Sequence, residues 1–308
     1  MMKKIRFLMS VIFMVFAFMS LTVVCYAGEK DKDVGEFISV GEMAVGFSEN
    51  MVPQNTDFVG KEFKLYFPNG MVINHKVFDK DTLSWEIIEG EGKGEKNSCT
   101  YYAVSPREGV YVLSFVNAYG DAKIVNMVIN TKTGAALVQE GYLPSEKDAS
   151  IPLWKRAQSK TPMTSIKVEY TNASYEKPFT KNTPKIERTR DLIGKRVQFT
   201  YSSKDAYEHI YLNDHSYVWN CISGNEKGNA DTEQCQYFKI EDDLYLFSWQ
   251  EKAVPTIGFV VENFDVKRSF GAIYGYDGFD FEKVINIPVG SYLKELNTTN
   301  YDYSLLKD

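Results

Sequence analysis

The chain has 308 residues, of which 44% are hydrophobic and 25% are charged, so it can bury the core of one or two domains and is not globally disordered. Its formal net charge of -6 argues against a nucleic-acid-binding protein, because phosphates require a basic surface. The three histidines have no paired ligand spacing, so we expect no metal site and no other cofactor. The 20 Tyr and 20 Phe residues suit β-strands and an aromatic-lined cavity.

Residues 1–27 have the three-part pattern of a secretory signal peptide. The first six residues include three basic side chains, an uncharged run follows over 7–24, and Ala27 is the expected cleavage residue. The uncharged run is also long enough to act as an N-terminal membrane anchor if it is not cleaved. We therefore expect an exported protein, periplasmic or extracellular. No membrane contact is expected beyond this segment, because its removal makes the chain still more acidic.

Three cysteines follow the signal segment: Cys99, Cys221 and Cys235. Because the count is odd, at most one internal disulfide can form. Cys221 and Cys235 could pair across a hairpin in an oxidising compartment. Alternatively, both are small buried residues with free thiols.

The chain contains an internal repeat. Val59–Phe67 matches Ile193–Tyr201 at an offset of 134 residues. The same offset pairs His75 with His209, Trp85 with Trp219, and Tyr111–Phe115 with Tyr245–Trp249. A two-residue insertion in the second copy would then align Cys99 with Cys235. These matches indicate a duplication in which each copy is a domain, since the period is too long for a solenoid repeat.

Each copy has the sequence pattern of short antiparallel strands. Val197, Phe199 and Tyr201 alternate with polar residues, and such runs recur about every ten residues between turn signals such as Pro68–Asn69–Gly70. No long amphipathic helical stretch interrupts them. Several strands are apolar on both faces, which favours a small closed barrel over an open sheet. We therefore predict an all-β protein with two tandem antiparallel barrels.

The repeat sets the predicted domain boundaries. We expect an N-terminal barrel over 28–150, a linker over 151–187, a C-terminal barrel over 188–290 and a polar tail over 291–308. The linker is rich in Lys, Thr, Pro and Ser and lacks sustained alternation. A short helix is expected within it around Leu153–Gln158.

The second copy resembles the C-terminal half of the molybdenum cofactor biosynthesis protein F family. The residues that carry this resemblance are Ala206–Leu212, Ala230–Cys235, Asp243–Phe247 and Gly275–Phe281. The first copy is similar to the N-terminal half of that family, and together the two cover about residues 55–290. The family name reflects a genetic association and implies no defined chemical step.

Each copy also resembles the barrel of phenolic acid decarboxylase, which implies a lipocalin-like (calycin) fold. In the second copy, Tyr201 matches the second catalytic tyrosine of that family and Glu251 matches its catalytic glutamate. Phe199 replaces the first tyrosine, and the catalytic arginine is missing near Asn229. The first copy lacks these groups and has Leu65, Phe67 and Asn117 instead.

Glu251 and Tyr201 are the candidate catalytic residues. Glu251 shares a strand face with Tyr245, Phe247 and Trp249. A carboxyl group in such an aromatic pocket should have a raised pKa and could serve as an acid/base group or hold a ligand cation. Tyr201 could orient a carboxylate or hydroxyl of a ligand. The alternatives are an exposed carboxylate at a strand end and a core tyrosine.

Further ligand-binding residues are expected on the same barrel. His209 recurs as His75, which favours a structural role for it, and strand alternation allows only one of Glu208 and His209 to point inward. The full candidate ligand-binding set is Tyr207, Glu208, His209, Trp219, Tyr237, Tyr245, Phe247 and Trp249.

The sequence supports three functions. The first is an exported protein that binds a small aromatic molecule in its C-terminal barrel, with a structural N-terminal barrel. The second is a cofactor-independent, lyase-like enzyme that uses Glu251 and Tyr201. The third is an interaction protein with filled barrels. The oligomeric state is left open.

Overall fold

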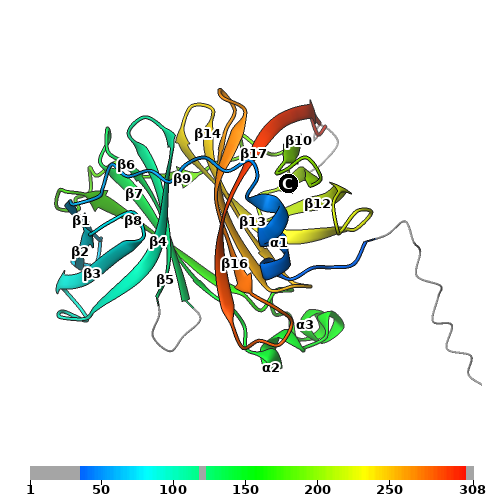
Figure 1. Ribbon diagram of the computed structural model, residues 1–308, viewed down its shortest axis with the longest axis horizontal. Helices are drawn as coiled ribbons and strands as arrows, with labels where there is room; N and C mark the ends of the chain where they lie inside the picture. The colour runs from blue at the N-terminus through cyan, green and yellow to red at the C-terminus, as the bar shows by residue number, and fades with distance from the viewer. Residues whose placement is uncertain (1–34, 118–122, 303–308) are drawn as a thin grey trace, which may run out of the picture. The chain divides into compact units, whose positions relative to one another are not determined.

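The computed structural model describes residues 35–117 and 123–302, so the predicted signal segment over 1–27 lies outside the described residues. Two closed antiparallel barrels follow one another along the described chain (Figure 1), as the repeat and the strand pattern predicted. No helix among the described residues is long and apolar enough to cross a membrane.

The N-terminal barrel consists of eight strands that each pair with the next. β8 closes the barrel on β1 through Leu65 opposite Tyr175 and Tyr66 opposite Ser174. The strands are β1 (Glu62–Tyr66), β2 (Val72–Val77), β3 (Thr82–Glu89), β4 (Lys96–Arg107), β5 (Val110–Asn117), β6 (Lys123–Asn130), β7 (Ala135–Tyr142) and β8 (Lys167–Tyr175).

The C-terminal barrel repeats this arrangement with β10 to β17. β17 closes it by pairing with β10, and the short strand β9 (Glu187–Arg188) adds to β13 from outside the barrel. The strands are β10 (Lys195–Thr200), β11 (Ala206–Asn213), β12 (Ser216–Ser223), β13 (Ala230–Glu241), β14 (Leu244–Glu251), β15 (Thr256–Asn263), β16 (Arg268–Tyr276) and β17 (Val284–Thr298).

Two predicted boundaries are corrected. The expected linker over 151–187 contains β8, because the N-terminal barrel needs an eighth strand to close. The expected tail over 291–308 contains the second half of β17, whose solvent-facing residues gave it a polar appearance. The short helix predicted within the linker is confirmed as α3 (Leu153–Ser159). It follows α2 (Glu146–Ala149), a single helical turn.

Strand register corrects the alignment of the two copies and the cysteine pairing. Leu83 lies opposite Cys99 and Tyr217 opposite Glu233, so Cys99 corresponds to Glu233 at the constant offset, without an insertion. Cys221 and Cys235 are free thiols. The Cys235 N–H donates to the carbonyl of His215, at the far end of β12 from Cys221, so a disulfide cannot form between them.

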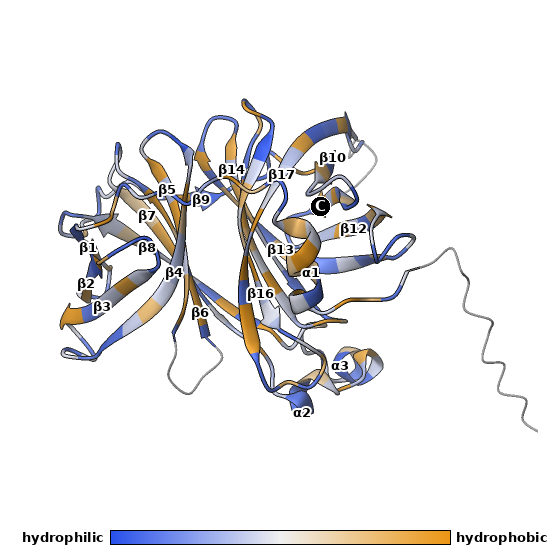
Figure 2. Ribbon diagram, viewed as in Figure 1, coloured by the Kyte–Doolittle hydropathy of each residue, from blue (hydrophilic) through white to orange (hydrophobic). Residues whose placement is uncertain are grey.

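Apolar and polar residues alternate along the strands (Figure 2), which separates each barrel interior from its outer face. Part of each outer face is also apolar, over β4–β7 in the first barrel and β13–β16 in the second. These two faces pack on each other in one cluster, which includes Val112, Leu137, Leu246 and Phe270.

Hydrogen bonds cross the same contact. Gln139 Nε2 donates to Ser248 Oγ at 2.7 Å and to the hydroxyl of Tyr170 at 2.9 Å, and that hydroxyl donates to Gln236 Oε1 at 2.8 Å. At the edge, the Arg107 guanidinium pairs with Glu241. The barrels therefore share a buried polar network as well as an apolar contact.

A short helix, α1 (Val40–Phe47), precedes the first barrel in sequence but lies against the second (Figure 1). Its first turn is closed by a capping box in which Ser39 and Glu42 bond each other's backbone N–H. Its apolar residues Val40, Met43 and Phe47 belong to the core of the C-terminal barrel.

Candidate functional site

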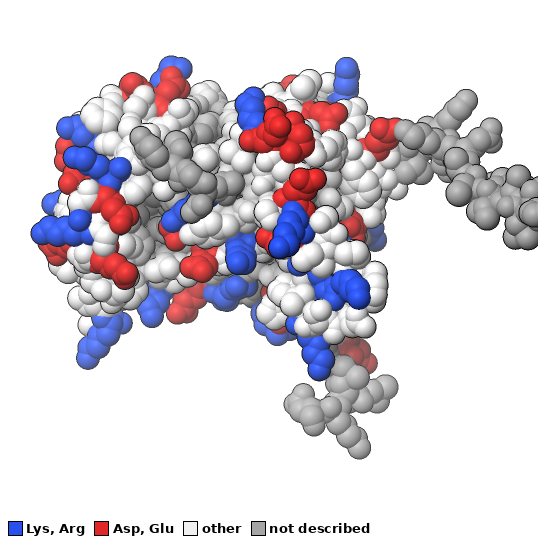
Figure 3. Space-filling model, turned by 90° about the horizontal axis from the view of Figure 1, so that it is seen from below, with Lys and Arg blue, Asp and Glu red and all other residues white. Residues whose placement is uncertain are grey.

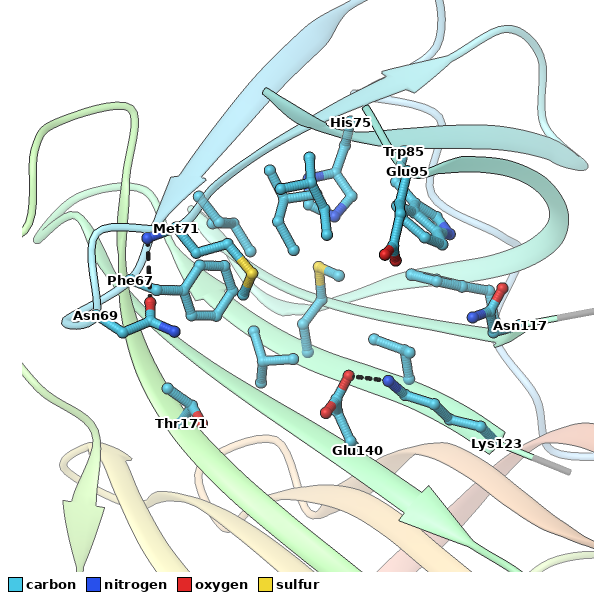
Figure 4. Close-up of a pocket in the computed structure, with 17 residues that line it drawn as sticks. Phe67, Asn69, Met71, His75, Trp85, Glu95, Asn117, Lys123, Glu140 and Thr171 are labelled. Atoms are coloured by element: carbon cyan, nitrogen blue, oxygen red, sulfur yellow. Dashed lines mark hydrogen bonds and ion pairs between the residues drawn. The ribbon is translucent and has the colours of Figure 1, made fainter. Parts of the chain in front are cut away.

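The N-terminal barrel contains a cavity of about 380 Å³ (Figure 4), which is within the size range of small-molecule sites. Aromatic and aliphatic side chains make up most of its wall, among them Phe67, Trp85 and Phe115. The polar side chains that line it are Asn69, Glu95, Asn117, Lys123, Glu140 and Thr171, together with His75.

An ion pair forms one side of this cavity. The Lys123 ammonium contacts the Glu140 carboxylate, and both side chains are partly exposed. Burial acts to lower the pKa of Lys123, but the hydrogen bond and charge of Glu140 outweigh it and raise that pKa. Asn117 is held by a 2.7 Å hydrogen bond from Asn97. The cavity therefore offers a neutralised charge pair and a fixed amide.

His75 lies deeper in the same barrel. Its ring stacks on Phe63 with the centroids 4.7 Å apart, and its Nδ1 has no hydrogen-bond partner. Burial lowers the pKa of His75 to about 4, so the ring is neutral near pH 7.

The interior of the C-terminal barrel is almost full. Its cavity measures about 30 Å³, room for little more than one water molecule. Met43 and Phe47 of α1 line this cavity, and the Phe47 ring stacks on Tyr201 at 4.2 Å with an interplanar angle of 7°. Phe37 contacts the edge of Trp219 at 5.9 Å. The sequence pattern predicts the ligand in this barrel, yet the larger of the two barrel cavities lies in the N-terminal barrel, which the pattern predicts to be structural.

Most of the predicted site residues do lie together inside the C-terminal barrel. Six of them line the small cavity: Tyr201, Tyr207, His209, Trp219, Trp249 and Glu251. Phe247 and Tyr237 stack on each other at 5.7 Å deeper in the core. Tyr245 is buried but lies outside the cavity lining, and its hydroxyl donates to Asp191.

Glu208 is the exception, and its assignment as a ligand-binding residue is corrected. Strand alternation turns it to the outside of the barrel, since its neighbours Tyr207 and His209 point inward. There it forms an ion pair with Arg196 at 2.6 Å and accepts a hydrogen bond from Asn220. Its role is to join three strands on the outer face.

Two carboxyl groups line the small cavity. Glu251, at the end of β14, accepts a 2.7 Å hydrogen bond from Trp249 Nε1, and burial together with the charge of Glu233 raises its pKa well above the ordinary range. Glu226 accepts hydrogen bonds from the Tyr207 hydroxyl at 2.8 Å and from the Ile38 N–H at 3.2 Å. Burial also raises the pKa of Glu226.

Two buried nitrogen atoms in the cavity wall have no hydrogen-bond partner, His209 Nδ1 and Trp219 Nε1. Each side chain is only 5% exposed. Burial lowers the pKa of His209 to about 3, so its ring is neutral near pH 7 and one ring nitrogen is an acceptor. Native proteins leave few buried polar atoms unpaired, so the wall of this cavity is unusual in having two.

Sequence reasoning missed Glu226, Tyr217 and α1. Glu226 directly follows Gly224–Asn225, a pair typical of turns, so local pattern predicts a loop residue there. Tyr217 shares a strand face with Trp219, so alternation alone could have found it. The spacing of Ser39 and Glu42 is the local signal that could have identified the start of α1.

Within residues 35–117 and 123–302, no group of three or more His, Cys, Asp or Glu side chains is placed to hold a metal ion. On the face drawn in Figure 3, acidic and basic side chains are interspersed among uncharged ones.

Comparisons with known proteins point to the same family in both halves of the chain. Residues 35–145 match the model of the MoaF N-terminal domain, and residues 186–299 match that of the MoaF C-terminal domain. The chain is 33% identical over 267 residues to Protein MoaF of Klebsiella aerogenes, an alignment that covers 86% of this chain and 97% of that protein.

Two solved structures are more distant. A crystal structure from Burkholderia vietnamiensis, described as a candidate β-lactamase, is 14% identical with a TM-score of 0.30 and covers 36% of this chain and 100% of its own. The DNA polymerase III beta chain of Streptococcus pneumoniae is 6% identical with a TM-score of 0.13, over 83% of this chain and 82% of its own. Neither likeness carries a functional argument.

Proposed function

The chain belongs to the MoaF family, and from that premise we propose that it is an exported protein that binds a small aromatic molecule inside its N-terminal barrel. The observation that carries the proposal is the cavity of about 380 Å³ in that barrel. Its aromatic wall and few polar groups are typical of a small-molecule site. The signal-like pattern of residues 1–27 supports export.

The polar groups favour a ligand without net charge. Lys123 is already paired with Glu140, so a charged ligand would have to break this ion pair in order to use either partner. A neutral aromatic compound with a hydrogen-bonding edge can leave the pair intact and bond Asn117 or Asn69. A pterin-like bicyclic compound meets these requirements better than a phenolic acid or an aromatic amine does.

The test is calorimetric titration of the purified chain with a pterin, a phenolic acid and an aromatic amine. Val125 lines the cavity, so Val125→Trp should fill it and abolish binding, whereas the matched control Val125→Leu should retain most of it. Dissociation constants no better than millimolar for all three compounds would contradict the proposal. Equal affinities in the wild type and in Val125→Trp would place the ligand elsewhere.

An acid/base enzyme is the second candidate, and the observation that favours it is the Glu251 carboxyl with its raised pKa near Tyr201. The cavity that these residues line is too small for a substrate while Met43 and Phe47 occupy its wall. Turnover of a phenolic substrate that is lost in Glu251→Gln would support this candidate. The filled-barrel interaction protein is less well supported, because the occupant of the C-terminal barrel belongs to the same chain.

A further inference from the structure

The two cavities occupy equivalent positions in the two copies. The strand register matches their walls residue by residue at the constant offset of the repeat. The matched lining residues are Phe67 and Tyr201, His75 and His209, Trp85 and Trp219, Phe115 and Trp249, and Asn117 and Glu251. The small cavity is therefore the same site as the large one, reduced in volume.

α1 accounts for part of the reduction. Met43 and Phe47 line the small cavity, and no helix stands at this place among the residues that line the large one. Ile38, just before α1, donates its backbone N–H to the Glu226 carboxylate, and the Phe47 ring of α1 stacks on Tyr201. A donor for a carboxylate and a ring for an aromatic wall are what a bound ligand would provide.

The chemistry of the wall indicates which ligand could replace the segment. Glu226 and Glu251 place two carboxyl groups at the cavity, and neither forms an ion pair with Lys or Arg among the described residues. His209 Nδ1 adds a buried ring nitrogen without a hydrogen-bond partner. The aromatic faces of Tyr201, Trp219 and Trp249 surround these groups, and such faces attract organic cations.

We propose that the C-terminal barrel is a second binding site, for a small organic ammonium compound, and that α1 occupies this site until the ligand displaces it. The ammonium group takes the place of the Ile38 N–H at Glu226 and lies among the aromatic faces. This site is independent of the one proposed in the N-terminal barrel, whose charge pair is already satisfied.

The contact between α1 and the C-terminal barrel can be weakened by a substitution at Gly41. A Cβ atom added at Gly41 would lie 2.3 Å from the Asp277 carbonyl oxygen, so a larger side chain there forces α1 and the loop at Asp277 apart. Val45, on the same helix, is 87% exposed and provides a control position. Trp219 and Trp249 line the site and report binding through their fluorescence.

The experiment measures binding of benzylamine to the full chain, with benzyl alcohol and benzoate as neutral and anionic counterparts. We expect Gly41→Val to bind benzylamine at least about tenfold more tightly than Val45→Ala, because less of the binding energy is used to displace α1. Benzyl alcohol and benzoate should show no such gain. Glu226→Gln or Glu251→Gln added to Gly41→Val should remove it.

A second variant covers the case in which Gly41→Val does not fold. A Cβ atom at Gly46 would lie 2.7 Å from Cγ of Asp205, so cysteines at these two positions can form a disulfide that locks α1 in place. Benzylamine should bind the reduced protein and not the oxidised one. Equal binding in both states, or a gain that survives Glu226→Gln and Glu251→Gln together, would overturn the proposal. Loss of benzylamine binding in Val125→Trp would assign it to the other barrel and also overturn it.

Discussion

The two barrels share a strand order and a register, yet the interior of one contains a large cavity and the interior of the other is nearly filled. The N-terminal barrel has a cavity of about 380 Å³, and the equivalent space in the C-terminal barrel is about 30 Å³. Part of the difference comes from larger barrel side chains, such as Trp249 where the first copy has Phe115. α1, which precedes both barrels in the sequence, also contributes, because its Met43 and Phe47 line the small cavity. The small volume of this cavity thus depends partly on a helix that is not one of the barrel strands.

The barrels also differ in charge. At the open cavity Lys123 pairs with Glu140, whereas strand register places Thr256 and Ile273 at the equivalent positions of the closed barrel. The closed barrel instead buries carboxyl groups, including Glu262 at the position of Ile129. The same fold therefore holds a balanced site and an acidic one.

The largest expected effect separates the equivalent tryptophans. Trp219 is buried under Phe37, whereas Trp85 is only partly buried beside the open cavity. We expect Trp219→Ala to lower the free energy of unfolding by about 3–5 kcal/mol and Trp85→Ala by about half as much, because a residue that faces an existing cavity loses fewer contacts. Urea denaturation measures both, and equal losses would contradict the comparison.

The next effect concerns Glu262. Burial raises its pKa to about 8, and a hydrogen bond from the Tyr211 hydroxyl only partly offsets this. Between pH 4.5 and 8 the folded protein keeps a proton that the unfolded chain has released, so stability falls as pH rises through this window.

Glu262→Gln should remove this contribution, which has a slope of about 1.4 kcal/mol per pH unit at most. The difference in unfolding free energy between the variant and the wild type should therefore grow from about pH 5 to about pH 8. This interval lies between the pKa of Glu262 in the unfolded chain and its pKa in the folded protein. Ile129→Leu is the matched control in the other barrel and should show no such growth. Parallel pH curves for the wild type and Glu262→Gln would show that Glu262 does not titrate in this window.

The smallest effect is expected at the rim of the open cavity. Lys123→Met removes the partner of Glu140, and because both side chains are partly exposed the loss of stability should stay below about 1 kcal/mol. Ligand selectivity should change more than stability, since the freed carboxylate favours cations. Calorimetric titration with benzylamine and benzoate measures this preference, and an unchanged ratio of affinities would contradict it.

Local sequence pattern was sufficient for the barrels and for most of the inward-facing residues. Alternation placed Tyr207 and His209 on one face, and the repeat identified the equivalent His75. Local sequence pattern could not reveal that β8 closes the first barrel, because that strand carries polar residues on its solvent side. Local pattern also could not predict the volume of the small cavity, because α1 lines it and lies far from the C-terminal barrel in the sequence.

The apolar contact between the barrels has a symmetry of its own. Val112 and Leu246 are equivalent in the repeat, as are Leu137 and Phe270, and all four lie in the shared cluster. Each copy therefore meets the other with the same patch, which is the geometry of an isologous two-fold dimer. A single copy would present this patch to water and pair with itself. Tethering the two copies in one chain makes such pairing independent of concentration.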